Sequence, residues 1–212
     1  MSLRARRTRD RILEASLQLF NQRGAPHVTT NDIAQELGMS PGNLHYHYRH
    51  KGDIVAELFA RFRARADAIL AVPAGRGTNV EDVWLFLHLL FEQVRDHRFL
   101  FRDLDELVSR DRKLRSALAQ LVAGIARTAG ELFRGLRESG EFRAEDGEIE
   151  ALAESVAMTA TYWLSYQALR PAPEAGEDPV GRGVYQALVA VAPFLRGRSR
   201  TLLAGLSRRY VE

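Results

Sequence analysis

Two helix-start signals lie close together near the amino-terminal end, and they constrain the fold more than any other feature of the sequence. Thr29 stands three residues before Asp32, the spacing of a capping box in which each side chain bonds the backbone of the other residue. Ser40 precedes Pro41, which combines a preferred N-cap with a preferred first helical residue. Gly38 lies between the two signals and suits the end of a helix. We therefore expect two very short helices joined by a tight turn.

The apolar positions predict which faces of these helices point inward. Ile33 lies on the apolar side of the first short helix, and Leu44 and Tyr48, four residues apart, lie on that of the second. An amphipathic helix is predicted over residues 8–23, and another helix begins near Lys51. Two short capped helices separated by a glycine-containing turn form a helix-turn-helix.

The outward side of the second short helix carries polar and aromatic side chains. In a helix-turn-helix, the second helix lies in the DNA major groove with its first residues toward the base edges. Asparagine can pair with adenine, histidine and tyrosine can bind phosphates or bases, and a glycine allows the backbone to approach closely. The candidate DNA-binding residues are Thr29, Thr30, Ser40, Pro41, Gly42, Asn43, His45, Tyr46 and Lys51. Lys51 is expected to hold a phosphate.

Positive charge is concentrated at the amino-terminal end. Residues 1–61 contain nine Lys or Arg and six Asp or Glu, whereas residues 62–212 contain 21 of each. Five arginines fall within the first eleven residues, namely Arg4, Arg6, Arg7, Arg9 and Arg11. Such a block is typical of a nucleic-acid contact. However, only two of the 30 basic residues are lysines, and genome composition alone can produce that bias.

The segment over residues 8–58 resembles the DNA-binding segment of the TetR family of transcriptional regulators. The residues that carry the resemblance are Phe20, Gly24, Thr29, Ile33, Ala34, Gly38, Leu44, Tyr48 and Lys51. The resemblance implies an all-α fold, with an N-terminal three-helix DNA-binding domain in residues 1–50 and a C-terminal helical ligand-binding and dimerisation domain in residues 51–212. His45 departs from the tyrosine that is common in the family, and an imidazole would make a phosphate contact pH-dependent.

The remainder of the chain reads as helices separated by Pro/Gly-containing loops. Val83–Phe91 is apolar on every helical face except at His88, which predicts a helix buried on all sides. Pro193 is expected to break a helix near the carboxyl-terminal end. The other predicted helices cover residues 59–70, 99–111, 118–136, 149–169, 184–194 and 202–210, with loops over 71–79 and at Pro171 and Pro173.

A ligand pocket in the second domain is implied by the family resemblance. Its candidate lining residues are aromatic or polar-tipped groups in apolar helices: Trp84, His88, Phe91, Phe99, Phe101, Tyr162, Trp163 and Tyr166. Trp84, His88 and Phe91 share one helical face. Because no cluster of buried cations calls for a phosphate, a small hydrophobic or aromatic effector is expected. Packing within the core is the alternative for each of these residues.

The family resemblance also implies a homodimer that forms through the C-terminal helices. Small and apolar side chains on two predicted helices suit four-helix packing across a two-fold axis. They are Val156, Ala157, Ala160 and Trp163 on one helix, and Tyr185, Leu188, Val189 and Ala192 on the other. Packing within a single chain is again the alternative.

Composition excludes several other classes of protein. The chain has no cysteine, which excludes disulfides, zinc fingers and thiol catalysis, and no cofactor is expected. His45 and His47 project about 200° apart on a helix, so no metal site is expected there. The longest apolar stretch is far shorter than the roughly 18–20 residues of a membrane span, and no signal peptide is visible. A cytoplasmic protein without membrane contact is predicted.

An enzyme is not expected, because the sequence contains no nucleophile elbow, P-loop, dinucleotide fingerprint or zinc-protease motif. Asp103, Asp105 and Glu106 lie beside Arg102 or four residues from Arg110, which favours ion pairs on a helix surface. The predicted function is a sequence-specific, ligand-responsive repressor that binds a palindromic operator of double-stranded DNA as a dimer. The alternative is a ligand-independent architectural DNA-binding protein.

Overall fold

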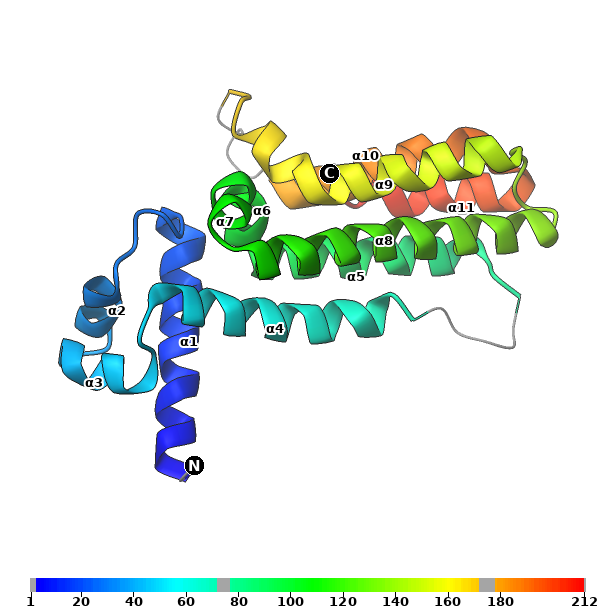
Figure 1. Ribbon diagram of the computed structural model, residues 1–212. Helices are drawn as coiled ribbons and strands as arrows, with labels where there is room; N and C mark the ends of the chain where they lie inside the picture. Colours follow the sequence, from blue (N-terminus) through cyan, green and yellow to red (C-terminus); the bar gives the residue numbers. More distant parts are fainter. Residues whose placement is uncertain (1–2, 72–76, 172–177, 212) are drawn as a thin grey trace. The chain divides into compact units, whose positions relative to one another are not determined.

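The computed structural model describes residues 3–71, 77–171 and 178–211 (Figure 1), and within these ranges every regular element is helical. The α-helices are α1 (Leu3–Arg23), α2 (Thr30–Glu36), α3 (Pro41–His47), α4 (Lys51–Ile69), α5 (Val80–Asp96), α6 (Arg98–Arg102), α7 (Leu104–Arg110), α8 (Arg112–Glu138), α9 (Asp146–Gln167), α10 (Pro179–Val191) and α11 (Gly197–Arg208). A short 3-10 helix, η1, covers Ala192–Phe194. The predicted all-α fold is confirmed. The loop predicted at Pro173, and residues 72–76 of the loop over 71–79, lie outside the described residues.

The chain forms two compact units. Unit 1 contains Met1–Ala64 and His97–Arg115, and unit 2 contains Arg65–Asp96 and Ser116–Glu212. The predicted boundary at residue 50 therefore differs from the observed division, because the first part of α4 and the whole of α6 and α7 pack with the amino-terminal helices.

Aromatic packing explains why residues from far along the chain belong to unit 1. The rings of Phe20 and Phe99 lie 5.3 Å apart, and those of Phe62 and Phe101 lie 5.6 Å apart. All four side chains are at most 2% exposed. Burial of large aromatic side chains dominates the stability of a core of this size. The first helices of the chain thus complete their core with α6.

The single helix predicted over residues 99–111 is divided into α6 and α7 at Asp103. The Asp103 carboxylate accepts a 2.7 Å hydrogen bond from the backbone N–H of Ala25, just beyond the end of α1. Gly24, which precedes Ala25, has a φ of +89°, a left-handed conformation that glycine adopts without a steric cost. The helix predicted over residues 8–23 thus ends at Arg23, as expected.

In unit 2, α5 packs against α9, α10 and α11. Its buried side chains are Val80, Val83, Phe86, Leu87, Leu90, Phe91 and Val94, whereas Leu85 is 45% exposed. Neighbouring helices cover α5 on one side, but the prediction of burial on all sides is wrong, because Leu85 faces outward and Trp84, His88 and Leu89 are only half-buried.

Helices of unit 2 pack very closely at Gly183 of α10. A Cβ atom at this position would lie 2.5 Å from a ring carbon of Phe91 and 2.7 Å from a ring carbon of Trp163. Only a residue without a side chain allows α10 to approach α5 and α9 this closely.

The predicted break at Pro193 is also confirmed, since α10 ends at Val191 and η1 follows it. Phe194 stacks on Phe142, which stacks in turn on Phe133 of α8. Among the described residues, no helix has the length and apolar character required to cross a membrane.

Candidate nucleic-acid interface

Side-chain caps define the two short helices of the helix-turn-helix. The Thr29 hydroxyl accepts a 3.1 Å hydrogen bond from the N–H of Asp32, and the Asp32 carboxylate accepts a 2.7 Å bond from the N–H of Thr29. These reciprocal bonds form the predicted capping box of α2. The Ser40 hydroxyl accepts a 3.2 Å bond from the N–H of Asn43, with Pro41 as the first residue of α3.

The capping hydroxyls of Thr29 and Ser40 differ in whether they still have a hydrogen to donate to DNA. The Thr29 hydroxyl donates its hydrogen to the Asp32 carboxylate at 2.7 Å, and this bond lowers the pKa of Asp32. Within the described residues the Ser40 hydroxyl donates no hydrogen bond, so its hydrogen is available to an acceptor such as phosphate. Thr29 is thus a capping residue, and its hydroxyl has no hydrogen left for the predicted DNA contact.

The two faces of α3 have opposite character. Leu44 is fully buried and Tyr48, which follows α3, is 2% exposed, as predicted. Tyr46 is 83% exposed, and Pro41, Gly42, Asn43 and His45 are also exposed. Thr30, at the start of α2, is half-buried. The short helix therefore places its apolar side in the core of unit 1 and leaves its polar and aromatic side open to a partner.

Local contacts orient the exposed side chains of α3. The Tyr46 ring lies edge-on to the ring of His47, with centroids 5.3 Å apart. His45 Nδ1 lies 3.2 Å from the backbone oxygen of Arg49, which leaves Nε2 for another partner. A Cβ at Gly42 would meet nothing within 4 Å, so the surface is open at this position. This face can read base edges through Asn43 and approach phosphates through Ser40 and His45.

A charged cluster, formed by Arg9, Tyr48 and Glu57, fixes the end of α3. The Arg9 guanidinium donates 2.9 Å to the backbone oxygen of His47, lies 4.3 Å from the centre of the Tyr48 ring and pairs with Glu57. The Tyr48 hydroxyl donates 2.9 Å to the Glu57 carboxylate. Burial, followed by this bond to Glu57, raises the pKa of Tyr48. Helices α1 and α4 thereby hold the carboxyl-terminal end of α3.

Lys51 contacts the backbone of its own chain, and its predicted phosphate contact stays a prediction. Its ammonium donates to the backbone oxygens of Ala25 at 2.6 Å and Val28 at 2.9 Å, with that of Pro26 at 3.5 Å. An ammonium has three hydrogens, and these three oxygens accept them. Lys51 therefore joins the start of α4 to the connection between α1 and α2.

Arg102 is a residue that sequence analysis missed as part of this unit. Its guanidinium donates 2.9 Å to the backbone oxygen of Phe20 and 3.2 Å to that of Asn21, so it caps the carboxyl-terminal end of α1. The predicted ion pairs are confirmed for two of the three carboxylates, at 3.3 Å between Arg102 and Asp103 and 2.8 Å between Arg110 and Glu106. The sequence showed these pairs, but not the distant backbone that Arg102 contacts.

The predicted ligand-binding residues do not form one cluster. Phe99 and Phe101 lie in the core of unit 1, where they pack on Phe20 and Phe62. Tyr162 and Tyr166 are 49% and 54% exposed on the outer face of α9. These four assignments are therefore corrected: two residues are core and two lie at the surface of the chain.

The other four predicted residues, Trp84, His88, Phe91 and Trp163, lie in unit 2. Trp84 and His88 stack with ring centroids 5.2 Å apart, and His88 Nδ1 lies 2.9 Å from the Tyr210 hydroxyl. Phe91 is fully buried, and the Trp163 indole N–H donates to the backbone oxygen of Pro179. Trp84 Nε1 is buried and makes no hydrogen bond of standard geometry to the described residues.

Part of the predicted dimer surface is instead the core of unit 2. Val156, Ala157 and Ala160 of α9 are at most 2% exposed, and Leu188 of α10 is fully buried. The cause is that α9 and α10 pack on each other within one chain. The exposed apolar side chains of these helices are Met158, Tyr162, Tyr166 and Val189, with Leu169 immediately after α9.

Comparison with known proteins agrees with this architecture. A family model described as "Bacterial regulatory proteins, tetR family" matches residues 12–58, and one described as "Bacterial transcriptional repressor" matches residues 61–203. A TetR-family transcriptional regulator from Marinobacter aquaeolei VT8 is 30% identical, covers 99% of both chains and superposes with a TM-score of 0.85.

Two more distant proteins are also similar. The probable HTH-type transcriptional regulator YttP of Bacillus subtilis is 23% identical over 65% of this chain and 67% of its own length. A putative transcriptional regulator from Saccharomonospora viridis, whose structure contains choline, is 23% identical over 90% of this chain and 99% of its own, with a TM-score of 0.72. The matched models span most of the described helices and include the capped helix-turn-helix. The chain belongs to the TetR family of DNA-binding transcriptional regulators, a non-enzymatic class.

Proposed function

We propose that this regulator is a homodimeric repressor that binds a palindromic operator and releases it when a small effector binds in unit 2. The observation that carries the DNA-binding part is the outward face of α3, where Tyr46 is 83% exposed while Leu44 is fully buried. A face of this kind, held by caps and by the Arg9 cluster, is ready to enter a major groove without rearrangement.

The proposed contacts divide into two kinds. Asn43 and Tyr46, with Gly42 allowing close approach, face the base edges, whereas Thr30, Ser40, Pro41 and His45 lie near the phosphates. Lys51 is left out of this set because its hydrogens are directed at backbone oxygens. One helix of seven residues reads only a few base pairs, so two copies are needed for a specific operator.

The outer face of α9 is the proposed contact between the two copies. Met158, Tyr162, Tyr166 and Leu169 recur at helical spacing and are 49–87% exposed. A continuous apolar stripe on one helix is typical of a protein–protein interface. Val189 of α10, 43% exposed, adds a further apolar side chain.

The effector is proposed to lie beside the Trp84–His88 pair in unit 2. The Trp84 indole N–H lies near the Tyr210 hydroxyl, where it opposes the rise in pKa that burial causes, and the stacked rings of Trp84 and His88 offer an aromatic surface to a ligand. We propose a small hydrophobic or aromatic molecule, and the choline bound by the Saccharomonospora viridis relative is one compound to test. Such a ligand weakens operator binding if it prefers the conformation that does not bind DNA.

Selection of bound sequences from a random DNA pool tests the operator. The expected product is an inverted repeat, and Asn43→Ala should then reduce discrimination between operator and mutated operator about tenfold. Gln18→Ala, which removes an exposed amide from α1 outside the helix-turn-helix, is the matched control and should bind as the parent does. Recovery of unrelated sequences with equal affinity would instead support the architectural alternative.

The dimer and the effector need separate measurements. Tyr162→Glu should convert the dimer to a monomer in sedimentation experiments, whereas Glu150→Gln, which is exposed on α9 about 120° around the helix from Tyr162, should not. The chain has only two tryptophans, Trp84 and Trp163, so an effector in unit 2 should change the intrinsic fluorescence. A dimer that survives Tyr162→Glu would place the contact elsewhere.

A further inference from the structure

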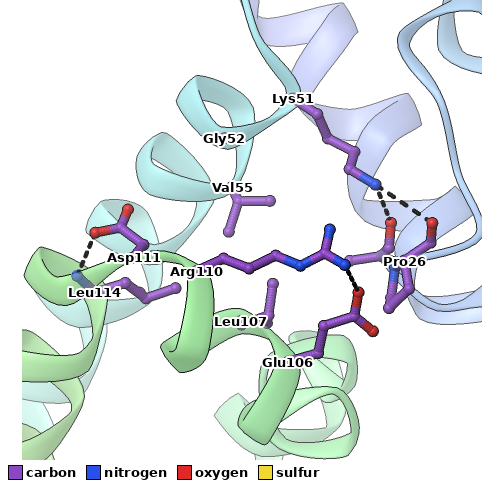
Figure 2. Close-up of a pocket in the computed structure, with 10 residues that line it drawn as sticks. Pro26, Lys51, Gly52, Val55, Glu106, Leu107, Arg110, Asp111 and Leu114 are labelled. Atoms are coloured by element: carbon purple, nitrogen blue, oxygen red, sulfur yellow. Dashed lines mark hydrogen bonds and ion pairs between the residues drawn. The ribbon is translucent and has the colours of Figure 1, made fainter.

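A pocket of about 250 Å³ lies wholly within unit 1. Its walls come from Ala25 and Pro26, from the first turns of α4 and from α7, with the start of α8 at one end (Figure 2). Its volume is slightly below the roughly 300–1,000 Å³ of sites for drug-sized molecules, so it suits a smaller ligand. None of the aromatic residues considered for the effector in unit 2 lines it.

The two ends of this pocket differ in polarity. Val55 and Leu114, both 6% exposed, form apolar wall together with Leu107. Figure 2 shows the side chains of Lys51 and Arg110 both directed toward the backbone at Pro26. The pocket thus combines an apolar surface with two cations at one end.

The nearby carboxylates are already engaged. Glu106 pairs with Arg110 at 2.8 Å. Asp111 accepts hydrogen bonds from the N–H groups of Lys113 at 2.8 Å and Leu114 at 3.0 Å, and lies at the Leu114 end of the pocket in Figure 2. Asp111 therefore serves the first turn of α8 and lies away from the cationic end.

Among the described residues, no carboxylate forms a direct ion pair with the positive charge of Lys51. Its ammonium bonds neutral backbone oxygens, which do not cancel its charge. Burial lowers the pKa of Lys51 from its ordinary value, and the positive charge of Arg110 lowers it further, ahead of the opposing effects of Glu106 and Asp103. An anion between the two cations would relieve this repulsion.

We propose that this pocket binds a small carboxylate with a compact apolar body, such as an aromatic acid. Its carboxylate lies between Lys51 and Arg110, and its apolar body lies on Val55 and Leu107. Because Lys51 also holds the oxygens of Ala25 and Val28, a ligand that draws the ammonium away loosens the connection between α1 and α2. Weaker operator binding then follows, a consequence that rests on the proposed function.

Nuclear magnetic resonance of the full chain with benzoate tests the site. Benzoate should cause saturable shifts at Gly52, Val55 and Leu107, with a Kd of about 1 mM or tighter. Benzamide, an uncharged molecule of similar shape, should bind about tenfold more weakly. Equal binding of benzamide, or benzoate shifts found only around Trp84 and Trp163, would overturn the proposal.

Two variants make the assignment specific. Arg110→Gln should raise the Kd for benzoate about tenfold, whereas Arg112→Gln, an exposed arginine that does not line the pocket, should leave it unchanged. Val55→Phe should fill the apolar end and abolish the shifts. An unchanged Kd in Arg110→Gln contradicts the site. Operator affinity is measured separately. If the protein binds benzoate at this pocket but binds no operator, the proposed function is wrong and the proposed pocket is still supported.

Discussion

Unit 1 and unit 2 both pack aromatic rings, but unit 1 relies more on charged side chains that bond backbone atoms where its helices meet. In unit 1, Lys51, Arg102 and Asp103 each bond backbone atoms of a distant segment, and the Arg9 cluster does the same at the end of α3. In unit 2, the corresponding junctions are filled by aromatic rings, as at Gly183 and between Phe133 and Phe142.

This difference follows from helix length. The helices α2 and α3 have seven residues each, too few to bury a wide apolar face, so polar bonds to their ends and connections fix their positions. The helices α8 and α9 have 27 and 22 residues and can rely on packing. A charged pair of unit 2, between Arg95 and Asp178, is nearly half-exposed at both side chains and contributes little.

The largest effect is expected from overpacking unit 2. Gly183→Ala places a Cβ against Phe91 and Trp163, so the free energy of unfolding should fall by about 2 kcal/mol, the cost of overpacking less the gain in helix propensity. Urea denaturation measures this change. Gly205→Ala in α11, where a Cβ meets nothing within 4 Å, should instead raise stability by about 0.5–1 kcal/mol. Equal effects of the two substitutions would show that the close packing at Gly183 does not contribute to the stability of unit 2.

Removal of the Lys51 ammonium is the corresponding test in unit 1. Lys51→Met leaves the buried oxygens of Ala25 and Val28 without this donor, and should lower the free energy of unfolding by about 1–2 kcal/mol. The other lysine of the chain, Lys113, is exposed, so Lys113→Met should change the free energy of unfolding by at most about 0.5 kcal/mol.

The same pair of variants decides between two roles of Lys51. A lysine that contacts phosphate contributes about one unit to the dependence of log affinity on log salt concentration. Because the Lys51 ammonium faces backbone oxygens, the slope for operator binding should be the same in the parent and in Lys51→Met. A slope reduced by about one would restore the phosphate contact.

A smaller effect is expected at the Arg9 cluster. Glu57→Gln weakens the bonds to Arg9 and Tyr48, and because both partners of the ion pair are about 30% exposed, stability should fall by only about 0.5–1 kcal/mol. Glu36→Gln, at an exposed carboxylate at the end of α2, is the control.

The pH dependence of Glu57→Gln gives a second readout. The raised pKa of Tyr48 favours the folded state below the pKa of about 10 that tyrosine has when unfolded, and this contribution is lost as pH rises through the folded pKa. Without the Glu57 charge the folded pKa of Tyr48 should be lower, so the loss still begins near the unfolded pKa of about 10 but is smaller and ends at a lower pH. Urea denaturation from about pH 9 to pH 12 measures the loss, and identical profiles for parent and variant would show that Glu57 does not control the pKa of Tyr48.

The smallest effect concerns the cap of α2. Thr29→Val removes the hydroxyl that lowers the pKa of Asp32, so this pKa should rise toward 3.8 in a carbon-detected titration. A lowered carboxylate pKa stabilises the fold above the unfolded pKa, and this contribution is lost as pH falls through the folded value. Thr30→Val is the control, and a shift of Asp32 in that variant alone would contradict the capping box.

The caps could be predicted from the sequence because they join residues three positions apart. Neighbouring residues alone determine the bond between Thr29 and Asp32, the bond between Ser40 and Asn43, and the helix break at Pro193. The inward face of α3 followed from helical spacing in the same way. Local rules therefore fixed the elements of the helix-turn-helix and its exposed surface.

The errors concern contacts between distant residues. The bonds of Lys51 span 23–26 positions, and that of Asp103 to Ala25 spans 78, so no local pattern marks them. Helical spacing places Tyr162 on one face of α9, but it does not show which face another helix covers. Similarly, the aromatic character of Phe99 could not show that its ring packs in unit 1.

The inclusion of residues 97–115 in unit 1 limits how this protein can be dissected. The backbone crosses between the units three times, so no single truncation or proteolytic cut yields either unit whole. A fragment ending after α4 would expose the Phe20 and Phe62 rings that α6 covers, and would invite aggregation. A separately expressed DNA-binding unit would need residues 97–115 joined to residues 1–64 through a designed linker.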